Sequence, residues 1–286
     1  MGAVTIIDAL RALTEGERER AAGLAAGADG EVARALTRYL EGGADGSVYD
    51  QPAAFTAFID GGGNVGLYQA VARELAGWYD DEPADDLLDV GCGDGRALVP
   101  SLERARHRPR KVTLLEPSAA LLAGAVERLR GVEGIVVDAR NVRVQEFLEG
   151  PEEVDLVQST FALHALPHEE RDQVLAALAP RVRKLALVEF DVPELDGDER
   201  LAFLAETYER GLAEYGDDRE LVAQGFLMPV LTGQLLPGAK RSTWEQPATA
   251  WAAQLRRTGF TEIRLEPLFD YWSSPAFLLT ASGTRR

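Results

Sequence analysis

The stretch LLDVGCGDGRAL, residues 87–98, constrains the fold more than any other part of this 286-residue chain. A short apolar run enters a turn that contains Gly91, Gly93 and Gly95, and a helix-like pattern follows. A strand that passes through a glycine turn into a helix is typical of open α/β sheets, which bind ligands at that turn. The sequence therefore predicts an α/β fold with a ligand site beside these glycines.

Strand and helix patterns alternate from residue 86 onward. Short apolar runs predict strands at 86–90, 111–117, 153–161 and 184–193, and helical patterns lie between them. Such alternation predicts a parallel sheet that is covered by helices on both faces.

The third strand has two candidate positions. We place it at 141–148, NVRVQEFL, because a short loop leads from there into the next strand. The apolar run GIVVDA at 134–139 is the alternative, and it would put Asp138 in the place of Glu146.

The C-terminal region departs from strict alternation. A predicted helix at 247–260 is followed by apolar runs at 261–269 and 274–282, which are too close for a crossover helix and should pair antiparallel. Outside the α/β pattern, the spacing of apolar residues is helical. We expect a helical arm at 1–85, an α/β core at 86–195 and 241–286, and a helical insertion at 196–240.

Composition limits the class of protein. The formal net charge of −17 opposes binding to a polyanion, because nucleic-acid affinity comes largely from Lys and Arg. The single cysteine, Cys92, rules out an internal disulfide and fits a reducing compartment. We find no signal peptide and no apolar run near the roughly 20 residues that span a bilayer. We expect a cytoplasmic monomer or homodimer without nucleic-acid or membrane partners.

Two acidic residues narrow the chemistry of the ligand. Asp89 ends the first strand, where it would repel a phosphate and attract an ammonium group. Glu116 ends the second strand, where an acidic residue accepts hydrogen bonds from both ribose hydroxyls. The loop also lacks the G-x-G-x-x-G spacing of dinucleotide sites. S-adenosylmethionine (SAM) has the expected ribose and positive groups, and it has no phosphate.

The run LLDVGCGDG, followed by LLEPS, resembles the class I SAM-dependent methyltransferases, and the resemblance covers roughly 86–195 and 243–283. It implies a Rossmann-like, mostly parallel seven-stranded sheet with an antiparallel C-terminal hairpin. The helical arm and insertion would form a lid. The implied activity is transfer of a methyl group from SAM to an O, N or C nucleophile of a small molecule in a biosynthetic pathway, with S-adenosylhomocysteine (SAH) as product.

The resemblance also assigns residues to the cofactor. The glycine loop would pass the methionine part of SAM, Glu116 would hold the ribose, and the end of the third strand would meet the adenine. The predicted SAM-binding residues are Tyr68, Asp89, Gly91, Cys92, Gly93, Glu116, Pro117, Gln145, Glu146, Phe147, Ser159 and Thr160. Asp94 is expected to cap the helix that follows the loop.

The segment QSTFALHAL, 158–166, would line the sulfonium and face the substrate. His164 is the candidate general base. We expect no metal, because the chain has three histidines and Pro167 interrupts the helix that would place His164 and His168 together. The predicted substrate-binding residues are Tyr49, Phe161, His164, Asp191 and Phe226.

Other functions could use the same core. Enzymes that methylate nucleobase amines or glutamine amides typically carry an Asn/Asp-Pro-Pro-aromatic run after the fourth strand, whereas this chain has QSTF, which favours a small molecule. A peptide or protein carboxyl methyltransferase would need an open groove, and a non-catalytic SAM-binding protein would show no turnover. An NAD-dependent dehydrogenase would need the glycine spacing that is missing here.

Overall fold

The structure is a computed structural model that describes residues 4–42, 52–238 and 243–285, and the chain forms two compact units. The first, the helical unit, comprises Met1–Val65, Glu194–Ser242 and Tyr271–Ser274. The second, the α/β unit, comprises Gly66–Pro193, Thr243–Asp270 and Pro275–Arg286. Helix α5 (Gly62–Asp81) begins in the helical unit, and its residues from Gly66 onward belong to the α/β unit.

Amphipathic helices build the helical unit. Its main elements are α1 (Ile6–Thr14), α2 (Arg18–Ala26), α3 (Glu31–Glu41), α4 (Pro52–Asp60), α10 (Gly197–Ala213), η3 (Gly216–Asp218), α11 (Arg219–Val222), η4 (Ala223–Leu227) and α12 (Met228–Leu235). Apolar residues at three- and four-residue spacing, such as Leu10 and Leu13 of α1, pack with Leu204 and Leu231 in one buried cluster. Segments that are far apart in the sequence therefore share this core.

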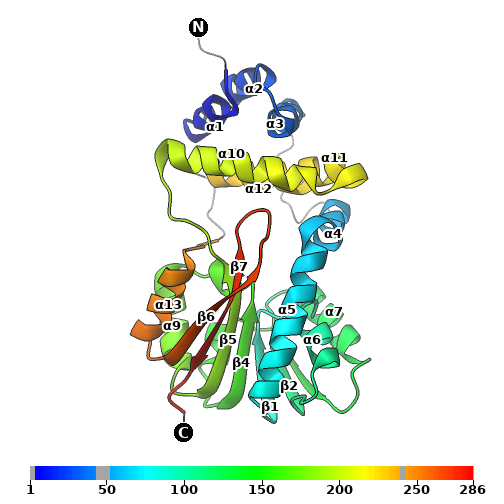
Figure 1. Cartoon of the computed structure of the whole chain (residues 1–286), viewed down its shortest axis with the longest axis vertical. Coiled ribbons are helices and arrows are strands. Elements are labelled where there is room, and N and C mark those ends of the chain that lie inside the picture. The colour runs from blue at the N-terminus through cyan, green and yellow to red at the C-terminus, as the bar shows by residue number, and fades with distance from the viewer. Residues whose placement is uncertain (1–3, 43–51, 239–242, 286) are drawn as a thin grey trace. The chain divides into compact units, whose positions relative to one another are not determined.

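The α/β unit alternates strands and helices as the sequence predicts. Its elements, besides the C-terminal part of α5, are β1 (Asp86–Val90), α6 (Leu98–Arg104), β2 (Lys111–Leu115), α7 (Ala119–Leu129), β3 (Val136–Arg140), α8 (Val144–Phe147), β4 (Val154–Thr160), η2 (Leu163–Ala165), α9 (His168–Leu178), β5 (Val182–Phe190), α13 (Ala248–Arg257), β6 (Thr261–Phe269) and β7 (Ala276–Ser282). Figure 1 shows the sheet between α9 and α13 on one side and α5, α6 and α7 on the other.

The sheet has seven strands in the order β3-β2-β1-β4-β5-β7-β6, which confirms the predicted fold class. The first five strands in this order run parallel, and β7 pairs antiparallel with both β5 and β6. The strand order reverses between β1 and β4. In open α/β sheets, the crevice at such a reversal, outside the carboxyl ends of the strands, is where ligands bind.

The prediction of the third strand at 141–148 is wrong, because the strand is β3, Val136–Arg140. Residues 144–147 instead form the short helix α8, in which Val144 and Phe147 are buried one helical turn apart. This i, i+3 spacing outweighs the short alternation that suggested a strand. The true strand lies at the edge of the sheet, and its exposed Val136 explains why the pattern does not resemble a buried parallel strand.

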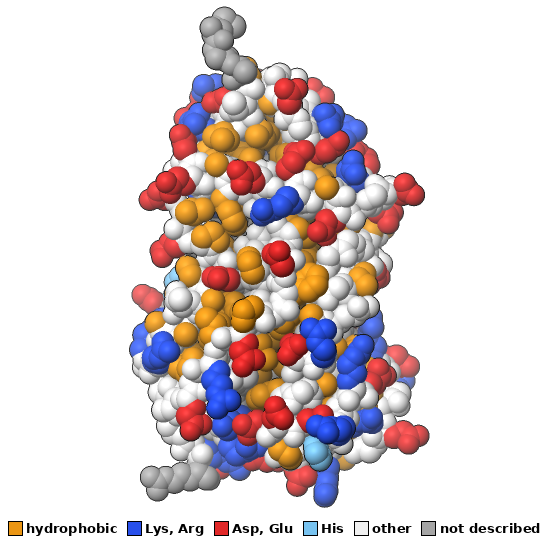
Figure 2. Space-filling view, viewed as in Figure 1, with side chains coloured by type: hydrophobic (Ala, Val, Ile, Leu, Met, Phe, Trp, Pro, Cys, Tyr) orange, Lys and Arg blue, Asp and Glu red, His pale blue; other side chains and the backbone are white. Residues whose placement is uncertain are grey.

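The surface and the helices bear on possible partners. In the described part of the chain, no helix is both long and apolar enough to cross a membrane. On the face seen in Figure 2, acidic and basic side chains are interspersed, and the basic ones do not gather into one continuous band.

Candidate active site at the carboxyl ends of β1 and β4

The glycine loop after β1 has a backbone that only glycine adopts easily. Gly91, Gly93 and Gly95 have φ angles of +71°, +55° and +79°, which L-residues rarely adopt. A Cβ atom on Gly91 would also lie 2.4 Å from the Cβ of Ala162. The backbone N–H of Gly91 donates to the carbonyl oxygen of Leu115 at 2.8 Å, so the loop is tied to the end of β2.

Glu116 lies directly after β2 and faces this loop. One carboxylate oxygen accepts from the backbone N–H of Gly93 at 3.1 Å, and the other accepts from the N–H of Ser118 at 2.8 Å. Ser118 is the N-cap of α7, and its side chain accepts from the backbone N–H of Leu121. Each oxygen retains a second lone pair, so the carboxylate can still accept hydrogen bonds from a diol.

Asp89 is buried in β1 and is only half satisfied. Its Oδ2 accepts from Nε2 of Gln158 at 3.0 Å, while Oδ1 has no hydrogen-bond partner among the described residues. Burial raises the pKa of Asp89 to about 7; the bond from Gln158 lowers the pKa, and the nearby charge of Glu116 raises it. An incoming ammonium group would supply both the missing donor and the missing positive charge.

These groups line one pocket of about 240 Å³ in the α/β unit. The structure brings together eight of the predicted site residues: Tyr68, Asp89, Gly91, Cys92, Gly93, Glu116, Thr160 and Phe161. Five further lining residues were not predicted to bind ligand: Asp94, Arg96, Ala97, Leu121 and Ala162. All five follow a strand end closely in sequence, which is the signal that could have identified them.

Aromatic side chains form one wall of this pocket. Phe161 stacks on Phe190 with ring centroids 4.5 Å apart, and Tyr68 meets Phe161 edge-on at 6.1 Å. Phe161 has a φ angle of +50°, which is unusual for a bulky residue. Such strain is found preferentially at functional sites, and here it directs the chain after β4 toward the pocket.

Asp94 does not cap α6, contrary to expectation, since the N-cap of that helix is Ala97. Its Oδ1 accepts from the backbone N–H of Arg96 at 3.2 Å, and its Oδ2 pairs with Arg128 at 3.0 Å. The carboxylate therefore stabilises the turn before the helix. Arg96 brings a guanidinium into the pocket, 6.0 Å from the centre of the Tyr68 ring.

The three residues predicted to meet the adenine lie on α8 instead of at a strand end. Gln145 donates to Glu170 at 2.5 Å, Glu146 accepts from the backbone of Arg143 at 3.4 Å, and Phe147 is buried. This placement follows from the wrong strand assignment. The rival Asp138 lies in the middle of β3 and is paired with Arg140 at 2.8 Å.

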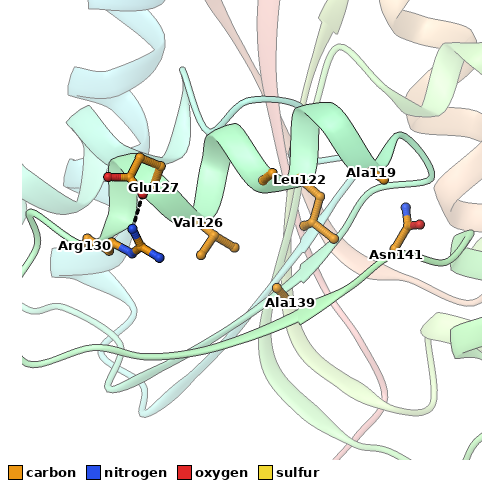
Figure 3. A pocket seen from close by; sticks show the side chains of 8 residues that line it. Ala119, Leu122, Val126, Glu127, Arg130, Ala139 and Asn141 are labelled. Carbon is orange, nitrogen blue, oxygen red and sulfur yellow. Dashed lines mark hydrogen bonds and ion pairs between the residues drawn. The ribbon is translucent and has the colours of Figure 1, made fainter.

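Asn141 is the residue that follows β3, and its role was not predicted. Its Nδ2 donates to the carbonyl oxygen of Glu116 at 2.8 Å and so braces the end of β2. Asn141 also lies at one end of a mainly apolar hollow of about 390 Å³ between α7 and β3. Figure 3 shows the ion pair of Glu127 and Arg130 at the opposite end.

The other predicted residues in the described parts of the chain are not among the lining residues of this pocket. Pro117 does not line it, and Ser159 donates its hydroxyl to the carbonyl oxygen of Val90 at 2.9 Å. Asp191 accepts from the backbone N–H that begins α13. Phe226 belongs to the helical unit, where it stacks on Phe58, and Tyr49 lies outside the described residues.

His164, which is partly buried, pairs with the buried Glu189 near the ends of β4 and β5. Its Nδ1 lies 2.8 Å from Oε2 of Glu189, and its backbone N–H donates to Oε1 at 3.2 Å. Burial lowers the pKa of His164, but the charge and hydrogen bond of Glu189 outweigh this and raise it above 6.5. Because an ionised carboxylate only accepts, the proton sits on Nδ1 and Nε2 is the basic nitrogen.

Cys92 and metal-binding groups offer no separate chemistry in the described residues. Burial and nearby carboxylates raise the pKa of the Cys92 thiol well above its ordinary value, which makes it a poor nucleophile. Residues 4–42, 52–238 and 243–285 contain no cluster of three or more His, Cys, Asp or Glu side chains that could hold a metal ion.

The pocket fits the polar groups of SAM. Two of its polar atoms, Oδ1 of Asp89 and Oγ1 of Thr160, are buried without a partner among the described residues. Such atoms are costly unless a ligand satisfies them. Glu116 can accept a diol, and the Arg96 guanidinium, which pairs with Asp94 at 3.3 Å, supplies a positive charge. The lining therefore matches a zwitterionic amino acid joined to a nucleoside.

Comparisons with known proteins agree with this geometry. Residues 87–184 match a family model described as a methyltransferase domain. An uncharacterized methyltransferase of Geobacillus kaustophilus (strain HTA426) is 27% identical over 161 residues, which cover 54% of this chain and 71% of that protein.

Two solved structures share the fold at low identity. Magnesium protoporphyrin IX methyltransferase from Synechocystis PCC 6803, with bound SAH, has a TM-score of 0.52 at 19% identity. The match covers 78% of this chain and 85% of that protein. The mitomycin 7-O-methyltransferase MmcR has a TM-score of 0.50 at 17% identity, and the match covers 93% of this chain and 71% of MmcR. Over residues 87–184 the chain is thus similar to methyltransferase domains, and it shares the fold of these solved methyltransferases.

Proposed function

We propose that the chain is a class I SAM-dependent methyltransferase that methylates a hydroxyl group of a small molecule, with His164 as general base. The observation that carries this proposal is the pairing of the partly buried His164 with the buried Glu189; His164 lies two residues along the chain from Ala162 in the pocket lining. A fixed basic nitrogen serves a nucleophile that arrives protonated, as a hydroxyl does. The named activities of the two solved neighbours, on a porphyrin and on mitomycin, are consistent with a small-molecule acceptor.

The same pair argues against the carboxyl methyltransferase alternative. A carboxylate is already ionised near neutral pH, so its methylation needs no base. A buried ionisable pair is costly to maintain unless it serves a function. The net charge of −17 adds repulsion toward RNA and toward acidic peptides.

The residues of the pocket have distinct proposed roles toward SAM. Asp89 accepts from the α-ammonium, Arg96 pairs with the carboxylate, and Glu116 accepts from the ribose hydroxyls. When bound, SAM supplies a methyl group on a positively charged sulfur. The protein contributes by holding the acceptor oxygen in line with that group, excluding water and taking up the acceptor proton on Nε2 of His164.

The test is turnover with matched acceptors. Purified enzyme and SAM are incubated with aromatic and aliphatic hydroxyl compounds, amines and carboxylates, and SAH release is measured. We expect turnover with a hydroxyl compound that falls at least a hundredfold in His164→Gln, while the Kd of SAH changes less than threefold. Turnover only with carboxylates, or full activity of His164→Gln, would overturn the proposal.

Three further expectations accompany this function and stay predictions. The acceptor belongs to a biosynthetic pathway, the helical arm at 1–85 and the insertion at 196–240 form a lid, and the enzyme is a cytoplasmic monomer or homodimer. Size-exclusion chromatography with light scattering measures the oligomeric state directly.

A further inference from the structure

Three buried polar side chains are linked by hydrogen bonds behind the pocket and form a hydrogen-bonded chain. The hydroxyl of Tyr79 on α5 donates to Oε1 of Gln158 on β4, and Nε2 of Gln158 donates to Oδ2 of Asp89 on β1. The exposed fractions of Tyr79, Gln158 and Asp89 are 1%, 0% and 2%. The chain ends at Oδ1 of Asp89, which has no partner among the described residues although Asp89 lines the pocket.

The direction of these hydrogen bonds is fixed by the carboxylate of Asp89. An amide can present either its oxygen or its NH₂ group to a neighbour, and the reversed amide of Gln158 would set a carbonyl oxygen against the carboxylate. Because an ionised carboxylate only accepts, Asp89 requires the NH₂ group of Gln158 and leaves the amide oxygen for the Tyr79 hydroxyl. By donating to that oxygen, Tyr79 satisfies the amide in the orientation that suits an ionised Asp89.

Burial makes this arrangement expensive for the fold alone. Apolar side chains of similar size would fill the space among α5, β1 and β4 without any need for paired polar atoms. Here a fully buried amide and a fully buried phenol support one carboxylate, and one oxygen of that carboxylate still has no hydrogen-bond partner among the described residues. This arrangement is explained if the ligand binds the remaining oxygen.

We propose that Gln158 and Tyr79 are positioning residues that hold Asp89 with Oδ1 open to the α-ammonium of SAM, and so make the site selective for that amino group. The inference rests on the proposed role of Asp89 in cofactor binding. Neither side chain lines the pocket, so both act through the carboxylate.

The experiment uses two ligands that differ in one group. SAH and its analogue without the α-amino group, a 3-carboxypropyl thioether of 5′-thioadenosine, are titrated calorimetrically into wild type, Gln158→Met and Tyr79→Phe. We expect wild type to prefer SAH by about ten- to a hundredfold, the range for a hydrogen bond to a charged group. Gln158→Met should reduce that preference to under threefold and Tyr79→Phe to an intermediate value, with the analogue's Kd almost unchanged.

The outcomes separate this inference from the one on which it rests. Tyr271→Phe, which removes a buried phenol that donates to Asn64 in the helical unit, controls for loss of stability and should keep the full preference. If both ligands weaken equally in Gln158→Met, the chain is merely structural and the inference is wrong. If wild type itself fails to prefer SAH, the role of Asp89 is wrong and the inference falls with it.

Discussion

The polar residues of the pocket are arranged to bind a ligand, and this arrangement lowers the stability of the protein when no ligand is bound. Asp89 is the clearest case, because burial disfavours its charge and Oδ1 has no partner among the described residues. The titratable groups near it are Tyr79, Cys92 and Glu116, and none supplies a positive charge. Stability and cofactor affinity should therefore respond in opposite directions when this carboxylate is replaced.

Asp89→Asn should stabilise the free enzyme at alkaline pH and weaken SAM binding. The pKa of Asp89 is raised from 3.8 to about 7, so its contribution to stability is full below pH 4 and is lost as the pH rises through 7. The loss amounts to up to about 4 kcal/mol. Urea denaturation at pH 5 and pH 8 should show a flatter pH dependence in the variant.

The contrary result would be a variant that is less stable than wild type at pH 8. Glu262→Gln on β6 is a suitable control, because the carboxylate is exposed and lies on an edge strand. It should leave the Kd of SAH unchanged.

Glu189→Gln should shift the pH profile of methyl transfer to lower pH and reduce kcat by about ten- to a hundredfold. His164 accepts a proton only when neutral, so the rate rises as the pH passes its pKa. Glu189 and Glu245 raise that pKa and Arg171 lowers it. Loss of the Glu189 carboxylate lowers the pKa of His164, and the proton of the neutral imidazole is then no longer held on Nδ1.

The profile is measured as kcat against pH with saturating SAM and acceptor. If the acid limb of the profile has the same apparent pKa in Glu189→Gln as in wild type, His164 is not the titrating base.

At the scale of elements, one buried arginine ties the turn that carries His164 to the segment before α13. Arg171 on α9 donates to the carbonyl oxygens of Leu163 at 3.3 Å and Trp244 at 3.0 Å. Its guanidinium also lies 3.9 Å from the ring centre of Trp251. Burial lowers its pKa to about 10, so it remains charged at neutral pH.

Arg171→Met should destabilise the enzyme by about 2–4 kcal/mol, because it leaves several buried acceptors without a donor. Arg257→Met provides the matched control, since Arg257 pairs with Asp172 on the surface and should cost under about 1 kcal/mol. Urea midpoints of the two variants give the comparison. Equal losses would mean that the buried bonds contribute no more than a surface pair.

The sequence predicts those elements whose patterns are set by burial. The strands β1, β2, β4 and β5 are buried apolar runs, and all four lie where expected. The edge strand β3 is half-exposed and contains Asp138 and Arg140, so its pattern is weak. The glycine loop and Glu116 could be predicted because they follow strand ends directly.

Other parts of the site depend on contacts between distant residues. The pairing of His164 with Glu189 joins positions 25 residues apart, and the bond of Tyr79 to Gln158 joins positions 79 apart. No local pattern encodes these distances. They follow from the strand order, which brings β1, β4 and β5 side by side.

At the scale of the whole molecule, the acidic balance determines which partners are attracted. The chain has 47 Asp and Glu residues against 30 Lys and Arg. Long-range repulsion therefore acts on any polyanion that approaches.

We expect no measurable binding of a fluorescein-labelled 20-nucleotide RNA at micromolar protein in 50 mM salt. Fluorescence anisotropy gives the readout, with a basic RNA-binding protein as positive control. Binding that weakens steeply toward 200 mM salt would instead reveal a local cationic surface.

The helical unit is built from segments that lie far apart in the sequence, and this has a consequence for synthesis on the ribosome. Its core joins α1 and α3 to α10 and α12, but the whole segment from Gly66 to Pro193 is made in between. At ordinary elongation rates, that segment takes roughly 6–25 s to synthesise. For most of this interval, the apolar faces of α1 and α3 are outside the ribosome while their partner helices α10 and α12 are not yet made. Nascent-chain chaperones should therefore engage the first 65 residues, and overexpression without them should favour aggregation at this stage.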